Sequence, residues 1–303
     1  MNTKINFAGI EMKNPVTVAS GTFGYGREIS EFYDLSKLGA VITKGTSLKP
    51  KSGNKPSRVT EVAGGMLNSI GLQNPGVEYF LENDLPFLRK FDTKIIVNAC
   101  GSSVEEYVEL CKILNEADID GVELNVSCPN VKAGCMAFGS TVEGVKLVTS
   151  EVKKVLTKKP LIVKLTPNVT DIASIAKAAE EAGADGISLI NTLLGMKIDI
   201  HKQKPVLANN TGGLSGPCVK PVAIRMVHQV ANAVNIPVLG MGGIMNGEDA
   251  IEFMLAGANA VSIGAGNFVN PYTGAITVEG IEDYMKKYNI EDINSIVGIV
   301  EMN

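Results

Sequence analysis

The chain has 303 residues, of which 45% are hydrophobic and 20% are charged, and its formal net charge is −4 at pH 7. This composition is typical of globular proteins and excludes disordered and fibrous classes, while the scattered basic residues argue against a nucleic-acid partner. The first residues lack the apolar core of a signal peptide and no apolar run reaches the roughly 18 residues of a membrane span, so we expect a cytoplasmic protein without a membrane partner.

Eight short apolar runs follow one another along the chain, mostly separated by helical patterns. They are VTVAS (16–20), AVITK (40–44), KIIVN (94–98), VELNV (122–126), LIVKL (161–165), GISLIN (186–191), PVLG (237–240) and AVSIG (260–264). Continuous apolar runs are typical of parallel strands that are covered on both faces. Eight such units predict an α/β fold of the (β/α)8 TIM-barrel type. An open doubly wound sheet is the alternative, but it needs a topological switch point and usually has fewer units.

Two of the intervening helices have recognisable start signals. Ser103 to Glu106 reads as a capping box, and Thr170 is expected to cap a second helix that ends near Gly183. The long stretches 45–90, 127–145 and 193–220 are expected to be elaborated loops of the barrel. No change in composition marks a second domain, so we expect residues 1–303 to form one domain.

Polar or cationic residues end six of the eight apolar runs. Because the C-terminal ends of barrel strands form the rim on which active sites lie, we expect these side chains to share one site. An asparagine at a strand end is usually only a turn residue, whereas a lysine that follows an apolar run is at risk of burial without a partner. Together they predict a site for a polar, electron-poor ligand. The six residues are Ser20, Lys44, Asn98, Asn125, Lys164 and Asn191.

Glycine-rich turns follow the last two runs, GMGGIMNGEDA at 240–250 and GAGNF at 264–268. Loops at these two positions form a phosphate site in many barrels, because glycine lets backbone N–H groups approach phosphate oxygens. Each turn alone more often marks an ordinary bend, but the two together favour a phosphorylated ligand. The candidates are Gly242, Gly243, Gly264 and the N–H of Ala265.

The strand ends also indicate which phosphorylated ligand to expect. The G-x-G-x-x-G motif of dinucleotide-binding domains is absent. Lysine and asparagine suit the polar edge of an isoalloxazine ring, where a fixed cation stabilises the reduced anion. The sequence therefore favours FMN.

The five cysteines are an odd number without C-x-x-C spacing, so we expect neither structural disulfides nor a metal site. Cys128 lies three residues after Asn125, and Pro129 favours an extended conformation for it. A thiol, with an ordinary pKa of about 8.5, can accept a carbon-bound proton if it is slightly activated. Burial as a small apolar residue is the alternative, which we assign to Cys100, Cys111 and Cys218. Cys135 competes for the reactive role.

Five segments resemble the dihydroorotate dehydrogenases, and the resemblance runs from about residue 5 to 300. They are VASGTFGYG, ITKGTSLKPKSGNKPSR, NSIGLQNPG, NVSCPNV and NNTGGLSGPCVKP, of which the third and fourth are highly specific together. Cysteine rather than serine at position 128, with no hydrophobic N-terminal extension, resembles the soluble class. The segment DIHKQKPVLANNTGGLSG is more similar to the NAD-linked type B than to the fumarate-reducing type.

The resemblance implies oxidation of (S)-dihydroorotate to orotate in de novo pyrimidine biosynthesis, with hydride passing to FMN. It implies that Cys128 is the base for the C5 proton and that Lys44 contacts both substrate and flavin. Ala265 stands where a small hydroxyl residue is frequent in the family, and Cys135 where glycine is common. The implied substrate contacts are Lys44, Asn68, Ser69, Ile70, Gly71, Leu72, Asn125, Asn191 and Thr192. The implied FMN contacts are Ser20, Lys44, Gly45, Asn98, Asn125, Lys164, Ile190, Gly216, Gly242, Gly243, Gly264 and Ala265.

The NAD-linked resemblance also implies a partner, because the electrons must leave the flavin. This partner would carry FAD and a [2Fe–2S] cluster, in a heterotetramer of two subunits of each kind around a core homodimer. The alternatives are the fumarate-reducing enzyme and another FMN barrel, such as a tRNA dihydrouridine synthase, which would need a basic RNA surface. A different class is a non-redox phosphate-binding lyase or isomerase. A non-catalytic scaffold would leave Lys44, Cys128 and Lys164 unexplained.

Overall fold

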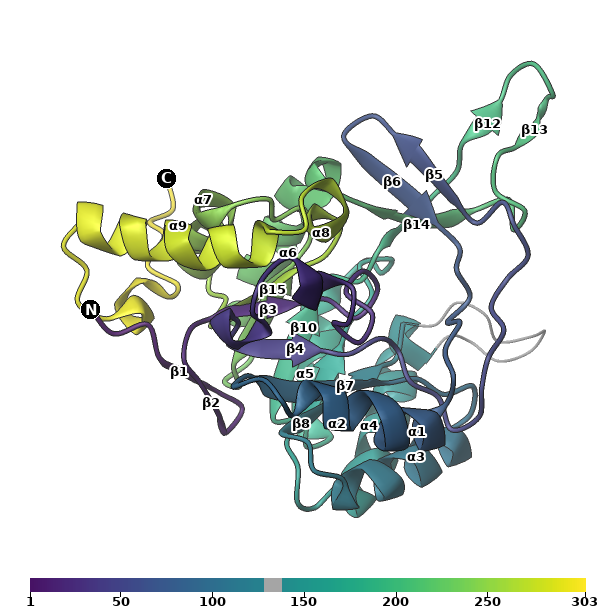
Figure 1. The fold of residues 1–303 in the computed structure, drawn as a ribbon, viewed down its shortest axis with the longest axis horizontal. Helices are drawn as coiled ribbons and strands as arrows, with labels where there is room; N and C mark the ends of the chain where they lie inside the picture. Colours follow the sequence, from purple (N-terminus) through teal and green to yellow (C-terminus); the bar gives the residue numbers. More distant parts are fainter. Residues whose placement is uncertain (128–137) are drawn as a thin grey trace.

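The computed structural model describes residues 1–127 and 138–303, and its centre is a closed barrel of eight parallel strands (Figure 1). The strands follow the order β10-β15-β16-β3-β4-β7-β8-β9 around the ring. The barrel prediction is therefore confirmed, since every one of the eight apolar runs overlaps a barrel strand and the ring closes. The strands are β3 (Val16–Val18), β4 (Ala40–Ile42), β7 (Lys94–Ala99), β8 (Gly121–Asn125), β9 (Leu161–Lys164), β10 (Gly186–Leu189), β15 (Val238–Met241) and β16 (Ala260–Ile263).

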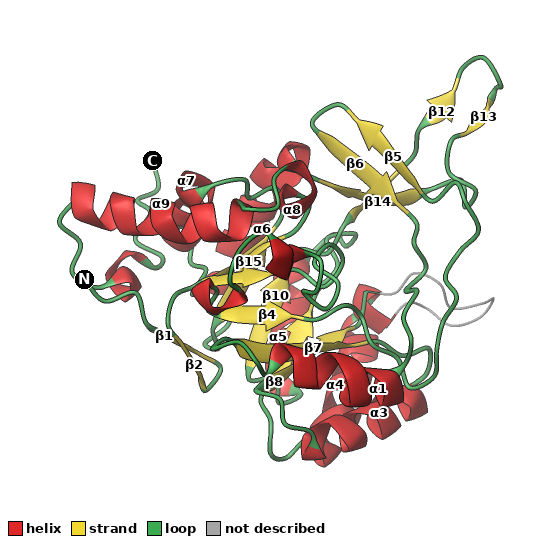
Figure 2. Cartoon of the chain, in the orientation of Figure 1, coloured by secondary structure: helices red, strands yellow, loops and turns green. Residues whose placement is uncertain are grey.

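Helices surround the barrel (Figure 2), and each of the long ones contributes buried apolar residues to the hydrophobic core. The long helices are α3 (Val104–Glu116), α4 (Val142–Val155), α5 (Ile172–Glu181), α6 (Lys220–Ala231), α7 (Gly247–Leu255) and α9 (Thr273–Lys287). Shorter ones are α1 (Val77–Tyr79), the π-helical turn Phe80–Asp84, α2 (Leu85–Leu88), α8 (Gly266–Val269) and the 3-10 turns Ile29–Glu31, Leu35–Lys37, Phe138–Ser140, Pro217–Val219 and Ile293–Ile296. Within 1–127 and 138–303, no helix has the length and apolar character needed to span a membrane.

The two helix-start predictions have different outcomes. Ser103 is the N-cap of α3 and accepts a hydrogen bond from the backbone N–H of Glu106 at 3.3 Å, as predicted. The Thr170 prediction is wrong by one residue, because Asp171 caps α5 and accepts from the N–H of Ser174 at 3.1 Å. An extended aspartate is among the preferred N-cap residues, since its short carboxylate reaches the N–H three residues ahead. Helix α5 ends at Glu181, two residues before Gly183, whose φ is +97°, so the end near Gly183 is as predicted.

An N-terminal hairpin of β1 (Ile5–Phe7) and β2 (Ile10–Met12) lies against the N-terminal ends of the barrel strands. A Cβ added to Gly186, the first residue of β10, would lie 3.3 Å from the ring of Phe7. A Cβ added to Gly121, which begins β8, would lie 2.8 Å from the Ile10 side chain. The hairpin therefore packs against the end of the barrel opposite the predicted rim.

The stretches that we expected to be elaborated loops contain a second sheet. Strands β5 (Val59–Val62), β6 (Gly65–Asn68), β11 (Leu193–Gly195) and β14 (Gly212–Ser215) form an antiparallel sheet in the order β11-β14-β6-β5. A further hairpin joins β12 (Ile198–Asp199) and β13 (Lys204–Pro205). These strands project from the barrel (Figure 1). Sequence patterns missed them because they are short and mostly half-exposed, without a run of apolar residues.

Candidate functional site

A chain of hydrogen-bonded amides crosses the C-terminal mouth of the barrel. Asn98 is the next-to-last residue of β7, Asn125 ends β8, and Asn191 lies two residues after the end of β10. The Nδ2 of Asn125 donates to the Oδ1 of Asn98 at 3.4 Å, and the Nδ2 of Asn191 donates to the Oδ1 of Asn125 at 3.4 Å. The three strand-end asparagines predicted to share one site are therefore in contact with one another.

A buried carboxylate that sequence reasoning missed lies beneath these amides. Glu123 on β8 has no exposed surface, and its side chain accepts hydrogen bonds from Asn98, Ser188 and Lys164. The Lys164 side chain is only 5% exposed, and its Nζ lies 3.4 Å from Glu123 Oε2. The partner that a buried lysine requires is thus present. A glutamate inside the apolar run VELNV, with a lysine in the next run, was the available signal.

Lys44 lies at a second part of the rim and is half-buried. Burial lowers the pKa of its ammonium, and the nearby Arg58 guanidinium lowers this pKa further. Lys44 lines a cavity of about 500 Å³ together with Lys51, Gln73, Asn74 and Pro75. The last three of these follow directly on the predicted substrate loop 68–72. The cation and the end of the loop therefore line the same cavity.

The antiparallel sheet fixes the start of the substrate loop against the strand ends. Asn68 pairs with Gly213 across β6 and β14, and its Nδ2 donates to the Gly213 carbonyl at 3.4 Å. A Cβ on Gly213 would lie only 2.0 Å from the Thr192 hydroxyl, so glycine is required for this close approach. Thr192 in turn donates its N–H to the side chain of Asn191 at 2.9 Å. Asn68 and Thr192 are thus both adjacent to Gly213, beside the chain of amides.

Asn54 and Arg58 hold the backbone of the substrate loop. Asn54 donates its side-chain amide to the Ser69 carbonyl and its backbone N–H to the Ile70 carbonyl, both at 2.9 Å. The N–H of Ser69 donates to the Arg58 carbonyl at 2.7 Å. Gly71 has a φ of +77° and no room for a side chain next to Asn54. Neither Asn54 nor Arg58 was among the predicted site residues, although both lie in the segment ITKGTSLKPKSGNKPSR.

The far end of the loop meets the barrel at Gly45. A Cβ on Gly45 would lie 3.2 Å from Asn98 Oδ1, 2.8 Å from Cys100 Sγ and 3.5 Å from a methyl group of Leu72. The hydroxyl of Ser69 is buried and finds no hydrogen-bond partner among residues 1–127 and 138–303. A buried hydroxyl without a partner costs roughly 1–3 kcal/mol, so this atom is suited to meeting a ligand.

The predicted phosphate residues converge on another side of the mouth. A Cβ on Gly243 would lie 2.9 Å from the Gly216 carbonyl, and one on Gly242 would lie 3.3 Å from Ile190. Gly216, Gly242 and Gly243 all have positive φ angles, which glycine adopts without strain. At Gly264 an added Cβ would have only the Cβ of Ala19 within 4 Å, at 3.9 Å. The backbone at Gly264, beside Ala265 and one strand from Ser20, therefore faces open space.

The thiols divide into three groups. Cys128 and Cys135 lie outside the described residues, although the hydroxyl of Ser127 donates to the Lys164 carbonyl at 3.2 Å. Cys111 is buried, and burial raises the pKa of its thiol to about 12. The interpretation of Cys218 as a buried residue is wrong, because this residue is exposed beside the turn at Gly64. Cys100 is buried as expected, but its Sγ also donates to Asn98 Oδ1 at 3.2 Å.

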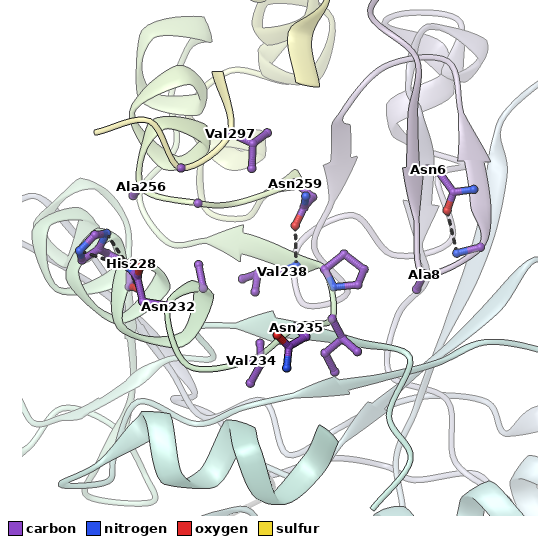
Figure 3. Close-up of a pocket in the computed structure, with 16 residues that line it drawn as sticks. Asn6, Ala8, His228, Asn232, Val234, Asn235, Val238, Ala256, Asn259 and Val297 are labelled. Carbon is purple, nitrogen blue, oxygen red and sulfur yellow. Dashed lines mark hydrogen bonds between the residues drawn. The ribbon is translucent and has the colours of Figure 1, made fainter. Parts of the chain in front are cut away.

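A larger cavity of about 560 Å³ lies at the opposite end of the barrel, between the β1–β2 turn and the loops that precede β15 and β16 (Figure 3). Two of its polar side chains bind backbone N–H groups of the surrounding loops. The Oδ1 of Asn6 accepts from the N–H of Gly9, and the Oδ1 of Asn259 accepts from the N–H of Val238, both at 2.9 Å. Active sites of such barrels lie at the other face. We therefore take the C-terminal mouth as the candidate active site.

Comparisons with known proteins agree over nearly the whole chain. A family model described as "Dihydroorotate dehydrogenase" matches residues 2–288. A protein of Alkaliphilus metalliredigens is 61% identical over 298 residues, and one of Alkaliphilus oremlandii is 62% identical over 297 residues. A protein of Bacteroides fragilis is 52% identical over 299 residues. Each alignment covers 98% of this chain and 98% of the relative, and all three relatives are named "Dihydroorotate dehydrogenase B (NAD(+)), catalytic subunit".

Proposed function

The chain belongs to the dihydroorotate dehydrogenase family, and on this premise we propose that it oxidises (S)-dihydroorotate to orotate in de novo pyrimidine biosynthesis. The names of its relatives support the NAD-linked type B over the fumarate-reducing alternative. The observation that carries the proposal is the convergence of Lys44, the amides of Asn98, Asn125 and Asn191, and the loop 68–72 at one mouth. A basic RNA surface, as a tRNA dihydrouridine synthase would need, has no counterpart in the sequence.

We propose that the mouth holds FMN, which when bound would accept hydride from the substrate. The open backbone at Gly264 suits a phosphate, and Gly242 and Gly243 adopt the positive φ angles of a glycine turn beside it. Lys164 and Asn98 suit the polar edge of the ring. The proposed FMN residues are Ser20, Lys44, Gly45, Asn98, Asn125, Lys164, Ile190, Gly216, Gly242, Gly243, Gly264 and Ala265.

The substrate site is proposed between Lys44 and the loop that follows β6. The ammonium of Lys44 would attract the carboxylate of dihydroorotate. The Ser69 hydroxyl, which has no hydrogen-bond partner in the described part of the chain, offers a further hydrogen bond. Side-chain amides present both a donor and an acceptor, as the alternating N–H and C=O groups of a dihydropyrimidine ring require. The proposed substrate residues are Lys44, Asn68, Ser69, Ile70, Gly71, Leu72, Asn125, Asn191 and Thr192.

Cys128 is proposed as the base that takes the C5 proton. Two observations on its neighbour support this assignment. The hydroxyl of Ser127 is bonded to the Lys164 carbonyl, and its N–H donates to Asn125 Oδ1 at 3.3 Å. Ser127, the residue before Cys128, is therefore held by hydrogen bonds to the ends of β8 and β9, next to the proposed substrate residue Asn125.

We further propose a partner subunit that carries FAD and a [2Fe–2S] cluster, in a heterotetramer with two copies of each chain around a core homodimer. The words "catalytic subunit" in the relatives' names support a partner of some kind. The cytoplasmic location and the single FMN-binding domain over residues 1–303 remain predictions.

Anaerobic mixing of the purified chain with dihydroorotate tests the proposed function. We expect the visible absorption of bound flavin to bleach without NAD⁺, and sustained NAD⁺ reduction to appear only after co-expression with an iron–sulfur flavoprotein. A purified chain that binds no flavin would instead support a non-redox barrel enzyme. Robust NAD⁺ reduction by the chain alone would contradict the required partner.

A further inference from the structure

Glu123 belongs to a polar layer that runs across four neighbouring barrel strands. In the strand register Asn98 on β7 pairs with Glu123 on β8, Asn125 on β8 pairs with Lys164 on β9, and Lys164 pairs with Ser188 on β10. Glu123 and Asn125 are two residues apart, so their side chains leave the same face of β8. Because Asn125 is nearer the C-terminal end, Glu123 lies about 6–7 Å deeper in the barrel.

The hydrogen bonds of Glu123 connect the bottom of this layer to the proposed flavin residues. Its Oε2 accepts from Asn98 Nδ2 at 2.5 Å and lies 3.4 Å from Lys164 Nζ. Its Oε1 accepts from the hydroxyl of Ser188 at 2.8 Å. Glu123, Asn98 and Ser188 have no exposed surface, and Lys164 is 4% exposed. One carboxylate therefore fixes two of the side chains proposed to meet the flavin.

The carboxylate also balances charge. Burial of the Lys164 ammonium without a partner would be strongly disfavoured. The Glu123 carboxylate, 3.4 Å away, compensates for the lost hydration of the ammonium and balances its positive charge. Because Asn98 and Lys164 share the same carboxylate oxygen, removing the negative charge disturbs both at once. The field that Lys164 projects toward the mouth thus depends on the group beneath it.

We propose that Glu123 is a positioning residue that orients Lys164 and Asn98 and sets the net charge beneath the flavin ring, and thereby the affinity for FMN and its reduction potential. The inference rests on the proposed function, since it concerns the same site. Glu123 lies deeper in the barrel than the proposed substrate residue Asn125, and it acts through Lys164 and Asn98.

Glu123→Gln keeps the shape of the side chain and removes its charge. We expect FMN to bind the apoprotein about tenfold more weakly, as when a charge-assisted hydrogen bond is lost. We also expect the reduction potential of the bound FMN to rise at neutral pH, because the unbalanced Lys164 cation then favours the reduced anion. Fluorescence titration measures the affinity, and a spectroscopic redox titration measures the potential.

Ser188→Ala is the matched control, because it removes one hydrogen bond from the same carboxylate and leaves both charges in place. We expect Ser188→Ala to lower thermal stability without moving the potential. If neither variant moves the potential, or if both move it equally, Glu123 is only a structural cross-link and the inference is overturned.

Glu123→Asp covers the case in which Glu123→Gln does not fold. The shorter side chain keeps its charge but cannot reach Ser188, Asn98 and Lys164 together, so FMN should again bind about tenfold more weakly. Affinity equal to that of the wild type would overturn the inference. A wild-type protein that binds no FMN would overturn the proposed function itself, which separates the two failures.

Discussion

Replacing Lys164 by methionine tests the energetics of the buried layer on which the site is built. The substitution keeps the length of the side chain but removes the ammonium 3.4 Å from Glu123, a carboxylate with no exposed surface. Removing one partner of a buried ion pair costs roughly 3–5 kcal/mol, because the other charge is left buried. The 3.4 Å separation between Lys164 Nζ and Glu123 Oε2 is long for a charged hydrogen bond. We therefore expect Lys164→Met to lower the free energy of unfolding by about 3 kcal/mol, the lower end of this range.

The expected change is large enough to measure directly. At about 2 °C per kcal/mol, the lower end for a large domain, the melting temperature of Lys164→Met should fall by about 6 °C. Thermal unfolding of the apoprotein measures this change without a contribution from bound FMN. The double variant Glu123→Gln/Lys164→Met contains no buried charge at this position and should recover most of the loss.

An exposed ion pair provides the control. Lys158 and Glu116 are also paired, but their side chains are 60% and 64% exposed. Lys158→Met should therefore change stability by less than about 1 kcal/mol. The reasoning is refuted if Lys164→Met is as stable as Lys158→Met, or if the double variant is no more stable than Lys164→Met alone.

Three further predictions concern activity. Gly213→Ala places a Cβ 2.0 Å from the Thr192 hydroxyl. It should raise the KM for dihydroorotate at least about tenfold, as expected for a displaced substrate contact, while the FMN content stays the same. An unchanged KM would contradict the proposed role of Thr192 in substrate binding. Cys128→Ser should keep FMN and lose most turnover at neutral pH, because an alcohol is a far poorer base, whereas the reverse pattern, with Cys135→Ser inactive, would move the base to Cys135. Because burial lowers the pKa of Lys44, its ammonium loses its proton at a pH below the ordinary lysine pKa of about 10.4, so the KM for dihydroorotate should start to rise at a lower alkaline pH than with an ordinary lysine. Lys44→Arg should move this rise to higher pH. Identical profiles of KM against pH for the wild type and Lys44→Arg would exclude Lys44 from carboxylate binding.

The barrel followed from the sequence because its strands are buried on both faces and read as apolar runs. The same property placed Asn98, Asn125 and Asn191 at one mouth, since each lies at or near the end of an apolar run. Strand register then brings these side chains into contact, and no spacing along the chain contains that information. The family resemblance supplied their proposed roles, which the barrel pattern alone did not.

What the sequence analysis missed depends on long-range pairing. Strand β14 reads GGLS and has no apolar pattern, so only its pairing with β6 identifies it as a strand. Glu123 in the run VELNV has no visible partner until β9 and β10 are aligned beside β8. Thr170 and Asp171 are both good caps, and local backbone geometry decided between them.

The pairing of β6 with β14 joins segments that lie far apart in the chain, since Asn68 and Gly213 are separated by 145 residues. These two parts of the mouth therefore depend on each other for their strand pairing. Anyone transplanting the 53–72 segment from a relative to alter substrate preference must transplant 192–216 with it, because either piece alone would face a mismatched edge. Chimaeras that exchange both segments should remain folded, and single-segment chimaeras should lose substrate binding first.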